Sequence, residues 1–497
     1  MLSNNHRILP VVVRDSNLPH PIPSLMRPYF LLAAVVAGQP LLLTAQAPTL
    51  SPATRQFVSI EAPVVALTRV RVIDGTGAPA AAEQTIVMAN GKITAVGKTG
   101  STRVPAGARV VELTGHTVIP GLVGLHDHTF YTTSARSMQL NTSAPRLYLG
   151  SGVTTIRTTG SMSPYSEINL KRVIDKGEAA GPRMYITGPY LTGETGLGGM
   201  HQLLTPEAAR RVVAYWGEEG VTWLKFYTTV SRAAMGAAID EAHKRGIKVT
   251  GHLCSVSFRE AVALGIDNLE HGLFVNTDYD PEKKPDMCPQ GSMAKLGTLD
   301  MKSEPVSATF KEMIDKKVAM TSTLAVFELF VPNRPPLEQR VIDAMAPDVR
   351  TEYLTTRSQI SENAGFGISP EVFKKALDFE YAFVKAGGLL AAGVDPTGNG
   401  GALPGFGDQR NFELLIEAGF TPIEAIQIMT SNGAKVLGAY DRFGSVTAGK
   451  LADLVVIRGD PSVKPADIRN VVTVFKDGVG YDAPKLIESV RGLVGIR

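Results

Sequence analysis

The chain has 497 residues, of which 44% are hydrophobic and 20% are charged, and its formal net charge is +3. These values are typical of a soluble globular protein with room for one large domain and one smaller domain. They show no excess of basic residues of the kind that favours a nucleic-acid partner or an anionic membrane surface.

The N-terminal segment, residues 1–47, has the features of an export signal. Arg27 precedes an apolar run at 29–45 that is too short and too interrupted for a stable membrane span. We therefore expect a leader or signal peptide, cleaved after Ala45 or after Ala47. An uncleaved anchor or a disordered leader is the alternative. If the signal is used, the protein is exported to the periplasm or secreted.

The chain contains two cysteines, Cys254 and Cys288. Their spacing forms neither a Cys-x-x-Cys metal motif nor a disulfide framework. An exported protein can pair two cysteines in a single bridge, but we expect these two to remain unpaired.

Residues 64–112 and the C-terminal end after Gly444 are rich in short β-type runs separated by turn residues. Asn90-Gly91 separates two apolar runs, which is a strong hairpin signal, and Asp477-Gly478 follows another such run. We expect the two ends to complete one small β-sandwich domain, with its first part at 48–117 and its second part at 441–497.

Between these ends, residues 118–440 alternate between strand-like and helix-like segments. This alternation predicts an α/β fold, a (β/α)8 TIM-type barrel whose chemistry gathers at the C-terminal ends of the strands. The segment at about 275–370 is longer than an ordinary connection and is predicted to cover the barrel mouth as a lid. The expected strands lie at 121–126, 153–157, 183–187, 221–226, 247–251, 266–270, 318–323 and 389–394, with helices such as 206–218 and 231–245 between them.

Potential metal ligands stand at the ends of these strands. His126 and His128 are two residues apart at the end of the first strand, so their side chains point to one face and can bind one metal ion. A single histidine at a strand end is usually an ordinary polar residue. Further ligand-type residues stand at the ends of four other strands: Lys225, His252, His271 and Asp395. Such a regular placement at strand ends is hard to obtain by chance.

Lys225 lies between apolar residues, which is an expensive setting for an ammonium group. A buried ion pair or a lysine that reaches to the surface is the ordinary explanation. Beside two dications, however, burial and like charge lower the pKa of a lysine, and the neutral amine can take up carbon dioxide. The resulting carbamate carries two oxygens that can bridge two metals.

This set of residues resembles the binuclear-metal branch of the amidohydrolase superfamily. The resemblance extends over about residues 64–482 and also includes Val118-Ile-Pro-Gly-Leu, Glu270-His271-Gly272 and the C-terminal run from Thr447 to Ile457. Within the superfamily, the chain is most similar to prolidase-like and ochratoxinase-like peptidases.

The resemblance implies a role for each ligand. His126, His128 and Asp395 would hold the more buried of two divalent metal ions, and His252 and His271 the more exposed one. Carboxylated Lys225 would bridge them, and zinc is the expected metal. A water shared by two dications loses its proton near neutral pH, Asp395 would take that proton, and the exposed metal would polarise the substrate carbonyl.

Three further residues are candidates for substrate contact. Tyr227 could donate to an oxyanion or simply pack at the barrel rim, and His201 ends a glycine-rich loop that could approach a ligand. Family members often have Gly-Gly-His there, and Met200 interrupts that pattern. Arg410 could bind a substrate carboxylate, although a solvated arginine at a helix start is the simpler explanation. Four histidines are expected to have no catalytic role: His6, His20, His116 and His243.

These observations predict a metal-dependent hydrolase of the dipeptidase or carboxypeptidase type. It would cleave amide or peptide bonds of small substrates such as dipeptides and N-acyl amino acids. Hydrolysis of a lactone or cyclic amide, or deamination, is the alternative within enzymes. A barrel that serves as a non-catalytic scaffold is the alternative outside catalysis. The sequence also leaves open a homo-oligomer.

Overall fold

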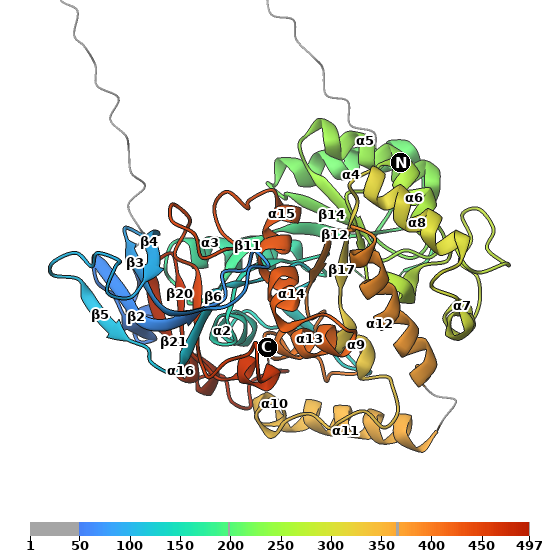
Figure 1. The fold of residues 1–497 in the computed structure, drawn as a ribbon. Helices are drawn as coiled ribbons and strands as arrows, with labels where there is room; N and C mark the ends of the chain where they lie inside the picture. The colour runs from blue at the N-terminus through green and yellow to red at the C-terminus, as the bar shows by residue number, and fades with distance from the viewer. Residues whose placement is uncertain (1–48, 197–198, 364–366, 497) are drawn as a thin grey trace, which may run out of the picture. The chain divides into compact units, whose positions relative to one another are not determined.

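The computed structural model describes residues 49–196, 199–363 and 367–496 (Figure 1). The predicted leader at 1–47, with His6 and His20, lies outside these residues, so export stays a prediction. Within the described ranges, no helix combines the length and the apolar character that crossing a bilayer requires.

The barrel is a parallel sheet whose hydrogen-bonded order is β11-β10-β7-β18-β17-β16-β15-β14-β12-β13. The two-residue strand β13 extends this order beyond β12. β11 at one end of the order and β12 near the other are separated along the chain only by Ile186. The sheet therefore closes on itself, as a TIM-like α/β fold requires. The strands are β7 (Leu122–Gly124), β10 (Val153–Arg157), β11 (Arg183–Tyr185), β12 (Thr187–Thr192), β13 (His201–Gln202), β14 (Trp223–Phe226), β15 (Lys248–Gly251), β16 (Asn268–Glu270), β17 (Ala319–Ser322) and β18 (Leu390–Ala392).

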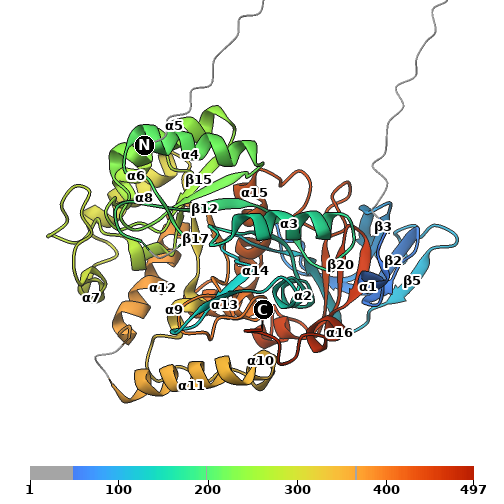
Figure 2. The same ribbon diagram turned by 180° about the vertical axis from the view of Figure 1, so that it is seen from behind.

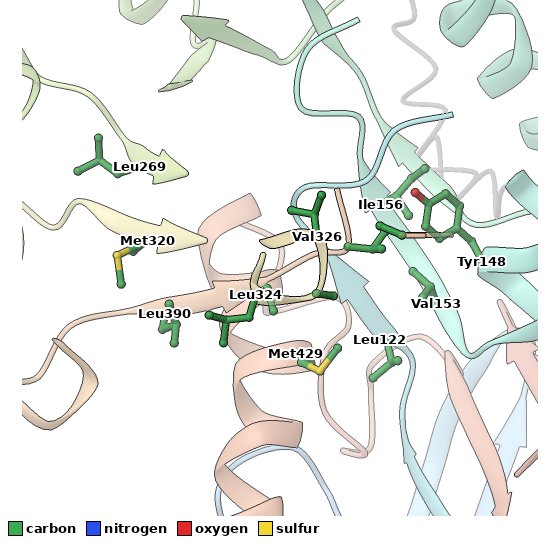
Figure 3. Packing of buried hydrophobic residues seen from close by; sticks show 14 of the residues in the cluster. Leu122, Tyr148, Val153, Ile156, Leu269, Met320, Leu324, Val326, Leu390 and Met429 are labelled. Carbon is green, nitrogen blue, oxygen red and sulfur yellow. The ribbon is translucent and has the colours of Figure 1, made fainter. Parts of the chain in front are cut away.

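Alternation along the strands separates an apolar outer layer from a polar interior. Leu269 and Met320 belong to the large hydrophobic cluster between the strands and helices, part of which is drawn in Figure 3. Their neighbours on the same strands, Asn268 and Thr321, point the other way, and the amide of Asn268 donates to the Thr321 hydroxyl at 2.9 Å. The period of two along a strand thus directs Glu270, two residues after Asn268, into the barrel.

Helices cover the outside of the barrel, and α4 and α5 lie side by side there (Figure 1 and Figure 2). Hydroxyl caps begin these two helices, because Thr205 accepts from the Ala208 amide and Ser231 from the Ala234 amide. The main covering helices are α3 (Pro164–Asp175), α4 (Pro206–Glu218), α5 (Arg232–Lys244), α6 (Phe258–Leu264), α8 (Glu304–Asp315), α12 (Pro370–Lys385), α13 (Phe406–Glu417) and α14 (Pro422–Gln427).

Strands from both chain ends form one nine-stranded sheet, visible as neighbouring blue and red arrows in Figure 1. Asn90 and Gly91 adopt positive φ between the paired strands β3 and β4, so the predicted hairpin is confirmed; Asp477 and Gly478 do the same between β20 and β21. The arrangement of this domain as a sandwich stays a prediction. The strands are β1 (Val58–Ile60), β2 (Val64–Val72), β3 (Ala81–Ala89), β4 (Lys92–Lys98), β5 (Arg109–Glu112), β6 (His116–Pro120), β19 (Leu454–Arg458), β20 (Val471–Lys476) and β21 (Val479–Asp482).

The segment predicted as a lid, about 275–370, is divided by β17 and its preceding helix α8, which are parts of the barrel. Two excursions remain, at 276–303 and 323–369. The second contains α9 (Leu324–Glu328), α10 (Gln339–Ala344) and α11 (Pro347–Glu362), and it begins directly at the C-terminal end of β17. Its function as a lid stays a prediction.

Cys254 and Cys288 form a disulfide, with their Cα atoms 5.0 Å apart, so the expectation of two unpaired cysteines was wrong. Cys254 lies in the loop after β15, and Cys288 lies in the excursion after β16. Parallel neighbouring strands end at the same edge, so these loops meet although 34 residues separate the cysteines in sequence.

Candidate metal centre

Four histidines and Asp395 meet at the C-terminal ends of the barrel strands. The ring centroids of His126 and His128 are 5.1 Å apart, and that of His271 lies 4.5 Å from those of both His126 and His252. One ligand atom each of His126, His128 and Asp395 lie within 4.8 Å of one another. The predicted ligands on strands far apart in sequence thus form one cluster, in which His252 alone is partly exposed.

Hydrogen bonds orient three of the imidazole rings. His126 Nδ1 lies 2.8 Å from Glu270 Oε2, His128 Nδ1 lies 2.9 Å from the Thr158 carbonyl oxygen, and His271 Nδ1 lies 2.8 Å from the Thr323 hydroxyl. In His126 and His128 the bond at Nδ1 leaves Nε2 facing Asp395, and in His271 it leaves Nε2 without a partner; a bond at Nδ1 is how proteins orient metal-binding histidines.

The partner of His126 is itself held rigidly. Both Glu270 and Arg157 are fully buried, and the Arg157 guanidinium donates to Glu270 Oε1 while it stacks 4.5 Å over the Trp223 ring. Asn268 Nδ2 donates to the same carboxylate at 2.9 Å. A buried ion pair with these additional bonds fixes the Glu270 carboxylate, and through it the ring of His126.

Burial keeps these histidines neutral. Desolvation lowers the pKa of His126 and His271 well below its usual range, and it lowers the pKa of His252 to about 3. The pKa of His128 is also lowered, mainly by burial. Neutral imidazole is the form that binds metals.

Asp395 lies among the histidines. Its Oδ1 is 3.4 Å from His128 Nε2, and its Oδ2 is 3.6 Å from His126 Nε2 and 3.8 Å from His271 Nδ1. Burial alone would raise the pKa of this carboxyl, but the histidines and Lys225 lower it far below its usual value, so it stays ionised. Asp395 and His271 also have positive φ, of 50° and 65°, a strained conformation that is common at functional sites.

Lys225 points into the barrel from β14, with Nζ 3.0 Å from His126 Nε2 and 5.0 Å from the centre of the Tyr190 ring. Burial lowers its pKa to about 8. The neutral amine, the form that reacts with carbon dioxide, is therefore more accessible near physiological pH than in an ordinary lysine, although the ammonium form still predominates.

The donors present fit divalent metal ions. Imidazole nitrogens and a carboxylate are the ligands that zinc and similar dications prefer. Moreover, His271 Nε2 is buried and has no hydrogen-bond partner among the described residues. A buried polar atom left unpaired is costly, and a cation at this position would satisfy it.

Of the three second-tier residues, the structure brings Tyr227 to the cluster. Its ring lies 4.9 Å from that of His252, and burial raises the pKa of its phenol, which therefore remains a donor. His201 instead packs edge-on against Trp216 of α4, and its loop includes residues 197–198, outside the described ranges. Arg410 lies on α13 and its guanidinium is engaged by Glu328 and Glu413. Contact of these residues with substrate stays a prediction.

Three residues beside the cluster were not predicted from the sequence to have a function: Glu270, Arg157 and Tyr190. The Tyr190 hydroxyl lies 3.2 Å from His128 Nε2. The sequence does mark Glu270 and Arg157, because each is a charged residue at the end of a strand that is otherwise uncharged. A buried charge at such a position requires a partner. Only the folded barrel shows which partner each one has.

Comparisons with known proteins agree with this geometry. The sequence profile described as Amidohydrolase family matches residues 117–278 and 386–480, together more than half of the chain. No curated protein matches the chain.

Among solved structures, a candidate prolidase from Bifidobacterium longum is 26% identical, with a TM-score of 0.63 over 86% of this chain and 98% of its own. A Xaa-Pro dipeptidase with bound methionine is 22% identical, with a TM-score of 0.61 over 84% of this chain and 100% of its own. For A. niger ochratoxinase the identity is 17% and the TM-score 0.61, over 87% and 100%. The last two show a shared fold.

The matched profile spans the strands that carry His126, His128, Lys225, His252, His271 and Asp395, and family membership supports metal-dependent amide hydrolysis. This chain belongs to the amidohydrolase family.

Proposed function

We propose that this protein is a binuclear-metal hydrolase that cleaves the amide bond of dipeptides or N-acyl amino acids, including those with a C-terminal proline or aromatic residue. The observation that carries the proposal is the buried cluster of four histidines, Lys225 and Asp395 at the strand ends. Its neutral imidazoles and ionised carboxylate form a ready donor set for dications.

His126, His128 and Asp395 would hold one cation, His252 and His271 the other, and Lys225, carboxylated by carbon dioxide, would bridge them. Zinc is the proposed metal because these nitrogen and oxygen donors suit it. The pair of cations, when bound, supplies a nucleophilic water of lowered pKa and polarises the scissile carbonyl.

The side chains supply the proton transfer. Thr397 donates its hydroxyl to Asp395 Oδ1 at 2.9 Å, which leaves Oδ2 as the atom that takes the proton of the attacking water. The same oxygen then delivers this proton to the leaving nitrogen. The protonated phenol of Tyr227, beside His252, donates to the oxyanion that forms on the substrate.

A small substrate panel tests the proposal. We expect the zinc-loaded protein to hydrolyse a dipeptide ending in proline or an N-acylated phenylalanine, to lose this activity on chelation and to regain it when Zn²⁺ is restored. The panel also contains a lactone and an amidine, and product formation is measured by chromatography. Turnover of only the lactone or only the amidine would favour the alternative chemistry, and no turnover of any compound would favour a scaffold.

We also propose that the protein is exported. The Cys254–Cys288 disulfide supports this, because such bonds persist in oxidising compartments. N-terminal sequencing of protein from its native host should therefore begin at residue 46 or 48. Cytoplasmic protein that retains Met1 would contradict the export proposal without affecting the proposed chemistry.

A further inference from the structure

The Cys254–Cys288 disulfide lies two residues beyond His252, one of the ligands proposed for the more exposed cation. It joins the loop after β15 to the excursion after β16. The hydroxyl of Thr277, also in that excursion, donates to the Cys254 carbonyl oxygen at 3.0 Å. The chain that follows His252 is therefore attached to the next loop by one covalent bond and one hydrogen bond.

His252 differs from the other three histidines of the cluster. Each of those has a hydrogen-bond partner at Nδ1, from a carboxylate, a carbonyl or a hydroxyl. Within the described ranges, neither ring nitrogen of His252 has such a partner. The centre of its ring lies 4.9 Å from that of Tyr227 and 4.5 Å from that of His271. Because nothing holds the ring by a directed bond, its position depends on its backbone.

That backbone is held on both sides. Before the bridge, the His252 amide donates to the Phe226 carbonyl oxygen at 3.1 Å, which continues the pairing of β14 and β15. After the bridge, the Ser255 amide donates to the Thr228 carbonyl oxygen at 2.8 Å. At the far end of the bridge, Asp286 accepts the backbone amide of Arg232, the first residue of α5, at 2.7 Å.

The disulfide thus lies between three loops at the barrel mouth, those that follow β14, β15 and β16. The loop after β14 carries Tyr227, the loop after β15 carries His252, and His271 directly precedes the excursion that contains Cys288. Without the bridge, the excursion would keep its bond to Arg232, and the Thr277 hydrogen bond alone would attach it to the chain beyond His252.

We propose that the Cys254–Cys288 disulfide is a positioning element for His252, and that it does for this histidine what a hydrogen bond at Nδ1 does for the other three. The inference rests on the proposed binuclear function. If it holds, cation binding by His252 and His271 depends on the disulfide. Cation binding by His126, His128 and Asp395 does not, because His126 and His128 have orienting hydrogen bonds of their own.

The test uses the full mature protein with Cys288→Ser, and the measurement is Zn²⁺ affinity for each of the two sites by competition with a chromogenic chelator. We expect the weaker site to lose about 10- to 100-fold in affinity, the usual effect of removing a group that orients a ligand, while the tighter site is unchanged. Loading with Co²⁺ should give the wild-type absorption spectrum for the first ion and an altered one for the second.

The control variant is Thr205→Ala, which removes the hydroxyl cap of α4, a bond that involves neither the disulfide nor any of the proposed metal ligands. It should lower the melting temperature but leave both affinities unchanged. Should Cys288→Ser not fold, folded wild-type protein can be reduced with dithiothreitol, alkylated with iodoacetamide, desalted and measured in the same way.

Selective weakening of one site supports the inference. Wild-type affinity at both sites, or equal weakening of both, overturns it while the proposed function stands. A wild-type protein that binds fewer than two cations overturns the binuclear function itself, and this inference with it.

Discussion

Asp395→Asn is expected to give a folded, largely metal-loaded protein whose turnover on its best amide substrate falls at least about 100-fold, the usual cost of losing a general base. The amide keeps the size of the side chain and an oxygen that can accept from Thr397, so stability should change little. It cannot take a proton from the attacking water. The measurement is turnover, together with metal content and melting temperature.

Asp300→Asn is the matched control, because Asp300 caps a local turn by accepting the Lys302 amide at 2.9 Å and has no contact with the cluster. It should retain wild-type turnover. Asp395 also supports a turn through Thr397, so a purely structural role would be worth only about 0.5–2 kcal/mol of stability. If the turnover of Asp395→Asn stays within about threefold of wild type, far from the expected loss, the proton acceptor must be another group.

Lys225→Ala should lose much of the bound metal and more than about 100-fold in activity, since removing even an indirect support of a metal ligand costs about 10- to 100-fold in affinity. Lys225 Nζ lies 3.0 Å from His126 Nε2, at the centre of the cluster, so its loss removes the proposed bridge. Formate or acetate should restore part of the activity, because a small carboxylate can supply the two bridging oxygens. Metal content and turnover, with and without the added acid, are measured together.

The control for this variant is Lys248→Ala. Lys248 is a partly buried lysine on the neighbouring strand β15, and its amine donates to the Val436 carbonyl oxygen rather than to the cluster. It should keep its metal and should not respond to added carboxylate. Full activity of Lys225→Ala would contradict the assigned bridge, and a loss of activity without rescue or metal loss would contradict the carbamate.

Local pattern was sufficient to predict the strands and the side chains that stand at their C-terminal ends; the role of these side chains as metal ligands stays a prediction. On β14, Leu224 and Phe226 alternate with Trp223 and Lys225. Because a period of two is a property of the extended backbone, Lys225 had to point to the side opposite Leu224. Turn chemistry was equally local, since Asn90 and Gly91 tolerate the positive φ that a two-residue hairpin requires. In a TIM-type barrel the C-terminal ends of all strands lie on one face. The residues at these ends were therefore expected close together before any distance was known.

Contacts between distant segments were decided only by the tertiary structure. Arg157 and Glu270 are 113 residues apart, and the bond between their side chains depends on two strands that end in the same barrel interior. The cysteines carried no spacing signal, because loop lengths do not reveal which loops meet at the mouth. By itself, the sequence determined which side chains could bind metal, since strand alternation is local. The closed barrel decided which groups orient them, because orientation requires partners that only three-dimensional packing brings within hydrogen-bond distance.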